Sequence, residues 1–427
     1  MPSEAGDAAG DAAGDGANPL VRRSLFVCMA QWAHMIQYLV TVQAVTQLWI
    51  DGFGGDFAAM ARAQGVVASL KSAATLCASP SVGAFSDAVG RKPLLCMEPL
   101  CDLFQRAVTL PTMTWRAQAL ADSVGGSTAG ACHSVWSAAL GDMWITDPTA
   151  LGAWQSRLML GNLLGSAVVP LLSSVLAAVS LRLPFAVSGL ICILNLLFMK
   201  VALPETLPPS RRKPFAWKAA SPLSFIKLFR SGKRLRLLCT LAVIDNWVAP
   251  VAGGHISSPI MAIYQADSLG WGLMQRGRFE SGSSALSFPG LFAAPWLMRR
   301  LGLEATVRLG IVSSSVALLV NFLGRKSWHL YLAILLGCFR SGGTHALTAM
   351  IAAEGATTTD LGQGDLQAQV SNFRSVLGTV SGLTWGWVYG MGSRRGVPGL
   401  FFLVGLACTL VQLGLAAAPL APRGGKK

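Results

Sequence analysis

Charged residues are scarce in this chain. Lys, Arg, Asp and Glu together make up 13% of the 427 residues, against roughly 25% in a typical soluble domain. Ten-residue segments of alternating polarity are also absent, which disfavours a membrane β-barrel. Hydrophobic residues reach 52%, and apolar stretches of about 20 residues recur, the length at which an α-helix crosses a bilayer. We therefore predict an all-α, multi-pass integral membrane protein.

Several chemical motifs are missing as well. The nine cysteines form no CxxC pair and fall in or beside apolar segments, so we expect no disulfide or metal framework. No GxxxxGK[ST] loop, HExxH sequence or Ser-His-Asp spacing occurs, and the acidic residues are dispersed, which argues against ATP-driven transport and against an enzyme. The net charge of +14 comes without an RNA-binding motif, so nucleic acid is not an expected partner. No cofactor is expected.

Apolar length and helix breakers predict twelve spans. The first six are expected at about 24–50, 60–81, 93–112, 117–140, 152–178 and 183–203. The second six are expected at about 236–264, 277–297, 303–324, 328–351, 367–391 and 397–418. Two sets of six predict two pseudo-symmetric six-helix bundles, an arrangement that suits alternating access around a central site.

Five regions follow from this division. We expect a disordered acidic tail at 1–21, bundles at 22–203 and 235–420, a linker at 204–234 and a basic tail at 421–427. The linker is rich in Lys and Arg, as is the segment before the first span, so both termini are predicted to be cytoplasmic. The positive charges that do not fit this orientation are Arg276, Arg278, Arg325, Lys326, Arg394 and Arg395. We expect a monomer in a membrane that the sequence does not specify.

The loop after the second span has the most specific pattern. It reads Gly83-Ala-Phe-Ser-Asp87-Ala-Val-Gly90-Arg91-Lys92. Gly83 would permit close helix approach, and Gly90 would end the helix. Asp87 and Arg91 stand four residues apart and can pair, and Asp87 is also placed to accept from the amides at a neighbouring helix N-terminus.

This loop resembles the signature loop of the major facilitator superfamily. The resemblance implies a transporter fold in which Gly83, Asp87, Gly90 and Arg91 form a latch that holds the two halves together in the outward-facing state. A degenerate copy around Gly302 has Arg299 in place of the acidic residue. The whole layout resembles the branch of tetracycline antiporters and hippocampus-abundant-transcript-like proteins. By the same resemblance, spans 1, 4, 7 and 10 line a central cavity.

Polar side chains in those four spans are the candidates for binding substrate or protons. Span 1 carries a polar stripe that includes His34 and Tyr38, with Gln37 adjacent to it. Four of the histidines fall one per cavity span, at His34, His133, His255 and His345. Histidine titrates near neutral pH and can relay protons. The alternative is that each one only bonds neighbouring helices. Their depths differ, so we expect no single histidine cluster.

Ionisable groups at membrane depth are costly and usually functional. Asp245 in span 7 is a candidate proton or cation carrier, and Arg340 in span 10 is a candidate contact for an anionic substrate. Alternatively, the two form a buried structural pair. Lys71 is a secondary candidate, as are Asp122 and Glu280, which are expected near the wet outer ends of their spans.

These features predict a secondary active transporter for a small organic solute, with proton-coupled export as the first interpretation. Ala121 or Asp122 stands where proton antiporters of the superfamily often carry an arginine, and the glycines of the fifth-span antiporter motif are eroded at Val169, Ser173 and Ser174. Uptake of an organic anion or a sugar therefore remains an alternative, as does a non-transporting sensor with a transporter fold.

Overall fold

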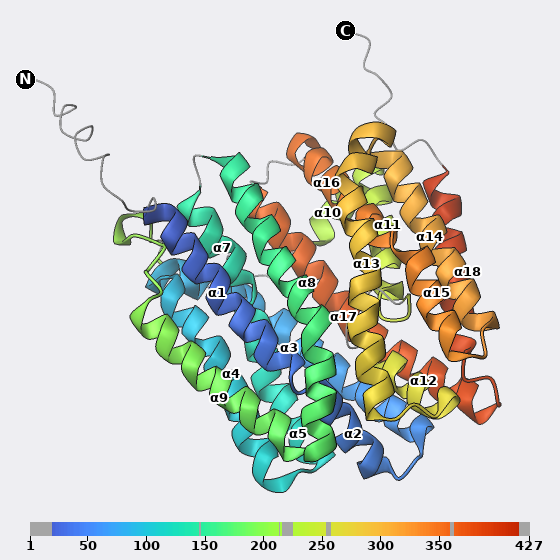
Figure 1. Cartoon of the computed structure of the whole chain (residues 1–427). Coiled ribbons are helices and arrows are strands. Elements are labelled where there is room, and N and C mark those ends of the chain that lie inside the picture. Colours follow the sequence, from blue (N-terminus) through green and yellow to red (C-terminus); the bar gives the residue numbers. More distant parts are fainter. Residues whose placement is uncertain are drawn as a thin grey trace, which may run out of the picture.

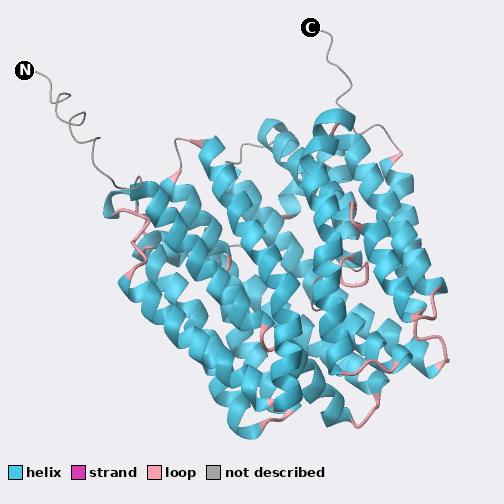
Figure 2. Cartoon of the chain, in the orientation of Figure 1, coloured by secondary structure: helices cyan, strands magenta, loops and turns pink. Residues whose placement is uncertain are grey.

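The computed structural model describes residues 19–144, 147–212, 214–215, 225–252, 258–358 and 363–417. Helices account for almost all of the described chain (Figure 2). The first and last described residues, Pro19 and Ala417, lie at the same end of the molecule (Figure 1). We call this the terminal end and the opposite one the far end. The expected disorder of 1–21 falls mostly outside the described residues, and the first helix begins at Pro19.

The N-terminal half contains six spans. In chain order they are α1 (Pro19–Leu39) with α2 (Val42–Phe53), α3 (Phe57–Val89), α4 (Arg91–Thr112), α5 (Trp115–Ala121) with η1 (Asp122–Gly126), α6 (Ser127–Cys132) and α7 (Ser134–Met143), α8 (Pro148–Val179) and α9 (Arg182–Val201). Two short helices follow, η2 (Pro209–Arg211) and α10 (Ile226–Arg230).

The C-terminal half repeats the plan. Its spans are α11 (Lys233–Val248) with α12 (Pro259–Leu269), α13 (Leu273–Leu301), α14 (Leu303–Leu323), α15 (Ser327–Gly337) with α16 (Arg340–Thr358), α17 (Gln363–Arg394) and α18 (Leu400–Ala416). The predicted fold, twelve spans in two six-helix bundles, is confirmed. Gly90 (φ 117°) and Gly302 (φ 84°) separate spans 2 and 3 and spans 8 and 9. Both need the positive φ that glycine adopts without strain.

Spans 1, 4, 7 and 10 share a feature that sets them apart from the other eight. Within the described residues, each is interrupted near its middle, whereas every other span is one continuous helix. Span 4 contains a π-helical turn at Asp122–Gly126, a distortion that often marks functional sites. Discontinuous spans near the middle of a membrane are also where transporters build binding sites.

The break in span 1 follows from its sequence. Thr41 lies between two valines, and its Oγ1 donates to the Tyr38 carbonyl at 2.9 Å, which competes with the helical backbone bond. The carbonyl of Gln37 accepts instead from the Ser188 hydroxyl of α9 at 2.7 Å. The backbone group that the break would otherwise leave unsatisfied is thus hydrogen-bonded inside the bundle.

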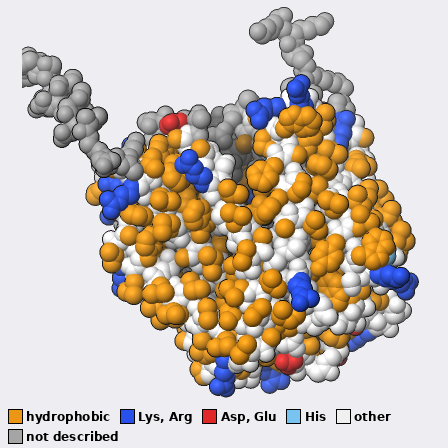
Figure 3. Space-filling view, in the orientation of Figure 1, with side chains coloured by type: hydrophobic (Ala, Val, Ile, Leu, Met, Phe, Trp, Pro, Cys, Tyr) orange, Lys and Arg blue, Asp and Glu red, His pale blue; other side chains and the backbone are white. Residues whose placement is uncertain are grey.

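Apolar surface covers the sides of the molecule. Hydrophobic side chains occupy most of the visible face, and Lys and Arg lie mostly toward its margins (Figure 3). Among the described residues, four helical stretches are long and apolar enough to span a bilayer by length and composition, namely Pro19–Phe53, Ala150–Val179, Arg182–Ala202 and Leu303–Leu323.

The halves meet at the far end through small residues. On α17, glycines recur every fourth residue at Gly378, Gly382, Gly386 and Gly390, and this stripe faces α3. A Cβ at Gly382 would lie 2.9 Å from the backbone oxygen of Gly65. Ser69 of α3 accepts a hydrogen bond from the Leu383 amide at 3.0 Å. Small residues that let backbones approach are the usual basis of helix packing in membranes.

A second contact between the halves joins α8 and α13. A Cβ on Gly277 would lie 1.8 Å from the Ser174 Oγ, so only glycine fits there. Ser281 Oγ accepts from the Leu171 amide at 3.1 Å. From this contact the two helices diverge toward the terminal end (Figure 1).

The hydrophobic core also differs between the two ends of the molecule. One cluster at the far end combines residues of both halves, such as Trp49 and Met60 with Phe279 and Tyr389. Two clusters at the terminal end are each confined to one half, one around Trp136 and the other around Leu238, Ile311 and Phe373. The structure is therefore closed at the far end, and each half has its own core at the terminal end.

Candidate functional site

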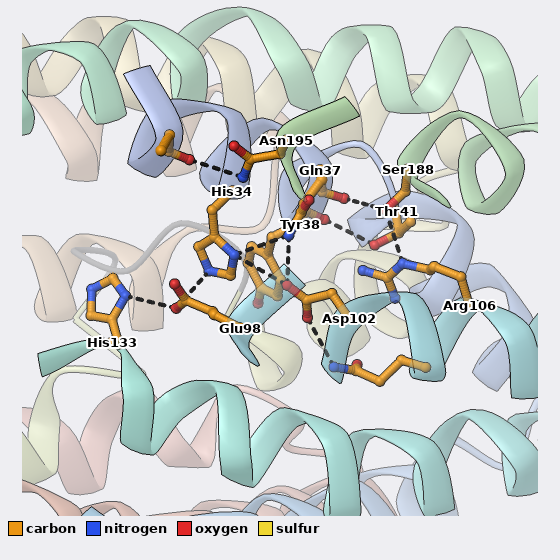
Figure 4. A network of polar contacts seen from close by, with 12 residues as sticks. His34, Gln37, Tyr38, Thr41, Glu98, Asp102, Arg106, His133, Ser188 and Asn195 are labelled. Atoms are coloured by element: carbon orange, nitrogen blue, oxygen red, sulfur yellow. Dashed lines mark hydrogen bonds and ion pairs between the residues drawn. The ribbon is translucent and has the colours of Figure 1, made fainter. Parts of the chain in front are cut away.

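A polar network lies inside the N-terminal half (Figure 4). We call it the His34 network and define it as His34 and Gln37 of α1, Glu98 and Asp102 of α4, and His133 at the junction of α6 and α7. His34 Nε2 lies 3.2 Å from Glu98 Oε1, and His34 Nδ1 lies 3.1 Å from Asp102 Oδ2. Gln37 also donates to Asp102 Oδ2 at 2.6 Å. His133 Nδ1 lies 3.4 Å from the same oxygen of Glu98.

The sequence prediction about the histidines was wrong in one respect. His34 and His133 were expected at different depths, yet both contact Glu98, and their ring centroids are 6.2 Å apart. Depth estimated by counting residues along separate spans ignores helix tilt, which shifts residues relative to one another.

Glu98 and Asp102 were missed because span 3 is not one of the four cavity spans. The acidic residues are accordingly less dispersed than expected. The detectable signal was the sequence Glu98-x-x-x-Asp102-x-x-x-Arg106, since a spacing of four places all three on one helical face. All three are buried, with exposed fractions of 1%, 5% and 5%. Buried charges in a span need partners inside the bundle.

Neighbouring side chains hold the network in place. Trp136 Nε1 donates to Glu98 Oε2, and Gln105 donates to Asp102 Oδ1 at 3.0 Å. Arg106 donates to the Ser188 hydroxyl at 2.9 Å rather than to a carboxylate. Both oxygens of each acid are therefore occupied, and Arg106 is bonded to Ser188 rather than to either of them.

A second polar group faces the middle of the molecule. Lys71 of α3 pairs with Asp122 at 2.8 Å, and both side chains are partly exposed. A Cβ at Gly126 would lie 2.9 Å from Lys71 Nζ and 2.3 Å from Asp122 Oδ1, so this glycine makes room for the pair inside the π-helical turn. Tyr38 is 44% exposed and within electrostatic reach of Lys71, Asp122 and Glu280. Asp122 is thus paired as well as partly wet.

In the C-terminal half, Asp245 and Arg340 do meet. Arg340 Nη2 lies 3.1 Å from Asp245 Oδ1 and also donates to the Asp245 carbonyl at 2.8 Å, while Thr344 donates to Oδ2 at 2.8 Å. The adjoining pocket, which Arg374 also lines, has a volume of about 10 Å³. That is room for about one water molecule. Both charges are compensated within the half.

Glu280 is not wet. It lies about two turns from the start of α13 and is 7% exposed, in the closed interface between the halves. Gln43 of α2 hydrogen-bonds it. Its Oε2 has no hydrogen-bond partner in the part of the chain that is described. One turn away, Arg276 donates to Gln47 Oε1 of α2 at 2.7 Å, which explains a positive charge that did not fit the loop pattern.

The loop at 83–92, for which a latch role was expected, lies at the terminal end and contacts its own half. Asp87 pairs with Arg91 at 2.6 Å, as predicted, and Arg91 also pairs with Asp142 of α7 at 2.8 Å. Glu205, rather than Asp87, accepts the hydrogen bonds of the backbone amides at the start of α4. The Arg91 amide donates to Glu205 Oε1 at 2.8 Å, and the Lys92 amide donates to Oε2 at 3.2 Å. This is the favourable position for a carboxylate at a helix N-terminus.

Two further predictions about single residues can be placed. The reason given for Gly83 was wrong, because a Cβ there would meet no atom within 4 Å. His345 is exposed on α16, away from the His34 network. His255 lies outside the described residues.

Comparisons with known proteins agree with this architecture. A family profile described as Major Facilitator Superfamily matches residues 27–384. Hippocampus abundant transcript-like protein 1 of Homo sapiens is 25% identical over 338 residues, which cover 77% of this chain and 63% of the human protein. The chain thus spans less than two thirds of that relative's length.

Two other similarities extend over most of both chains. The tetracycline resistance protein, class D, of Salmonella ordonez is 22% identical over 357 residues, covering 80% of this chain and 84% of that protein. The crystal structure of the human organic anion transporter MFSD10 superposes with a TM-score of 0.70 at 20% identity, covering 94% of this chain and 100% of the other. The resemblance inferred from the loop is confirmed, and the chain belongs to the major facilitator superfamily of membrane transporters, which are not enzymes.

Proposed function

We propose that this protein is a secondary active transporter that moves a small organic solute by alternating access and is driven by protons. In this proposal the terminal end is cytoplasmic, as the distribution of Lys and Arg predicts. The structure then corresponds to the inward-open state, because the halves are joined at the far end through α3 with α17 and α8 with α13.

Glu280 carries the argument for proton coupling. The carboxyl group is buried between the halves and lacks a partner for one oxygen. The charged and titratable groups near it are Arg276 on its own helix and Tyr38 on α1. No ion pair to Glu280 is formed in the described chain, and an ionised carboxylate is costly to bury without a close counter-charge. Protonation therefore favours closure of the far end, and opening would hydrate the group and favour its ionised form.

Asp245 and Arg340 take a different role in this proposal. Their charges neutralise each other, so Asp245 is not the proton carrier in this proposal. The pair instead positions α11 against α16. Tyr38, Lys71 and Asp122 are then the groups that contact the solute, because they are partly exposed toward the middle of the molecule.

The test uses purified protein in proteoliposomes with an imposed pH gradient. Tetracycline and a fluorescent organic anion are the first probes, since relatives carry these solutes in their names. We expect accumulation of a solute against its gradient, with proton movement reported by an internal pH-sensitive dye. Solute and proton moving in opposite directions would support antiport and export, and movement in the same direction would support uptake.

The Glu280→Gln variant should lose gradient-driven accumulation but keep exchange of solute for solute, because an amide imitates the protonated carboxyl group. Glu304→Gln is the matched control, since Glu304 lies at the start of α14 and pairs with Arg308 on its own helix. Accumulation by Glu280→Gln at the wild-type level would contradict the coupling role. Absence of flux for every solute, with folded protein, would favour the sensor alternative.

A further inference from the structure

Three nitrogen and oxygen ligands converge in the N-terminal half. One ligand atom from each of His34, Glu98 and His133 lies within 4.8 Å of the other two. They come from α1, α4 and the junction of α6 and α7. We propose that these three side chains bind a divalent transition-metal ion of the Zn²⁺ type.

The distances fit such an ion. Zn²⁺ binds His nitrogen and carboxylate oxygen at about 2.0–2.1 Å with tetrahedral geometry, which places two ligand atoms about 3.3 Å apart. The measured separations from Glu98 Oε1 are 3.2 Å to His34 Nε2 and 3.4 Å to His133 Nδ1. His133 has a side chain that is 53% exposed, so its ring can turn toward the ion.

The surrounding side chains orient these ligands as they do in established zinc sites. Asp102 Oδ2 lies 3.1 Å from His34 Nδ1. A carboxylate there accepts a hydrogen bond from Nδ1–H and leaves the Nε2 lone pair directed at the ion, the carboxylate–histidine–zinc arrangement. Trp136 Nε1 donates to Glu98 Oε2, which leaves Oε1 to bind the metal.

Charge and accessibility also support the site. Glu98 and Asp102 bring two negative charges into the bundle, and Arg106 donates to Ser188 rather than to either carboxylate. With neutral histidines, a bound cation compensates the remaining charge. Two imidazoles and one carboxylate favour zinc-type metals over Mg²⁺ or Ca²⁺, which prefer oxygen ligands only. The exposed side of His133 gives the ion a route of entry and leaves a fourth position open.

The sequence did not predict a metal site because the ligands come from three separate spans. This site is also independent of the proton role proposed for Glu280, which lies at the interface between the halves. Metal binding can be measured on the purified full-length chain in detergent, without transport, so the two proposals can fail separately.

The test is titration of tag-free, EDTA-treated protein with Zn²⁺ by calorimetry, and with Co²⁺ by visible absorption. We expect one site per chain and the intense visible bands of tetrahedral Co²⁺. His133→Gln is the first variant because its half-exposed side chain makes misfolding unlikely to confuse the result, and it should weaken binding by on the order of 100-fold. His34→Ala should do the same. Asp102→Asn should weaken it about 10- to 100-fold while leaving the stoichiometry unchanged.

His345→Ala is the matched control, since this histidine is exposed on α16, and it should bind like the wild type. Thermal unfolding confirms that each variant is folded. The proposal is overturned if the wild type takes up no Zn²⁺ in the micromolar range, or if His34→Ala and His133→Gln bind it as the wild type does.

Discussion

At the scale of single residues, several charges within the spans of this protein are paired with one another. Lys71 and Asp122 form one such pair beside the exposed ring of Tyr38. Both positions were visible in the sequence, but their pairing was not. The π-helical turn that brings Asp122 to Lys71 depends on Gly125 and Gly126, and a regular helix was expected there.

The Lys71–Asp122 pair makes a testable prediction about stability. Lys71→Met leaves the carboxylate without its partner and should lower the apparent melting temperature in detergent by several degrees, corresponding to about 1–3 kcal/mol. The double variant Lys71→Met/Asp122→Asn should recover part of that loss. If the single and double variants lose the same amount, the pair is not coupled.

A second prediction compares how much two acidic residues near the loop at 83–92, Glu205 and Asp87, contribute to stability. Glu205 accepts hydrogen bonds from the amides of Arg91, Lys92 and Leu207, so Glu205→Gln should lower the melting temperature by a few degrees. Asp87→Asn should have a smaller effect, because Arg91 keeps Asp142. Thermal unfolding of both variants is the measurement, and a larger loss in Asp87→Asn would contradict this account of the loop.

At the scale of elements, the contacts between the halves rely on glycine. Gly277→Ala places a methyl group where Ser174 lies, so it should disfavour closure of α13 against α8. Gly165→Ala on α8 is the control, because a Cβ there meets nothing within 4 Å. Accessibility of Ser281→Cys to a membrane-impermeant thiol reagent should increase in the Gly277→Ala background only. Equal labelling in both backgrounds would show that this contact does not control closure.

The elements also show what sequence can predict. Span number, order and approximate limits followed from apolar length, because crossing a bilayer requires about 20 apolar residues whatever the tertiary contacts are. The breaks in spans 1, 4, 7 and 10 did not follow, because they depend on contacts such as Ser188 with Gln37. The glycine stripe on α17 was present in the sequence, but which helix it faces is a property of the fold.

At the scale of the whole molecule, the structure corresponds, in the proposed mechanism, to one of the two end states that alternating access requires. The far end has a core shared by both halves, and the terminal end has separate cores. The superfamily could be recognised from one loop. The candidate site could not be predicted from the sequence. Glu98 comes from span 3, which is not among the four spans expected to line the cavity, and Glu280 lies in the interface that the two halves form when the far end is closed.

Proton coupling at Glu280 predicts how pH shifts the balance between these states. A buried carboxylate disfavours closure when ionised, so lowering the pH should favour the structure described above, and raising it should favour opening of the far end. Glu280→Gln should remove the dependence of this balance on pH, because its amide cannot ionise. Pulsed spin-label distances at the far end check both expectations, and a wild-type pH response retained in Glu280→Gln would exclude Glu280 as the sensor.

The most direct test of alternating access compares two distances across the same pair of helices. Spin labels at Val179→Cys and Gln275→Cys report the far ends of α8 and α13, and labels at Gln155→Cys and Arg300→Cys report their terminal ends, in a background lacking the exposed native Cys77. As pH rises or a transported solute is added, the far-end distance should lengthen while the terminal-end distance shortens. Distances that stay fixed, or that lengthen together, would contradict the account.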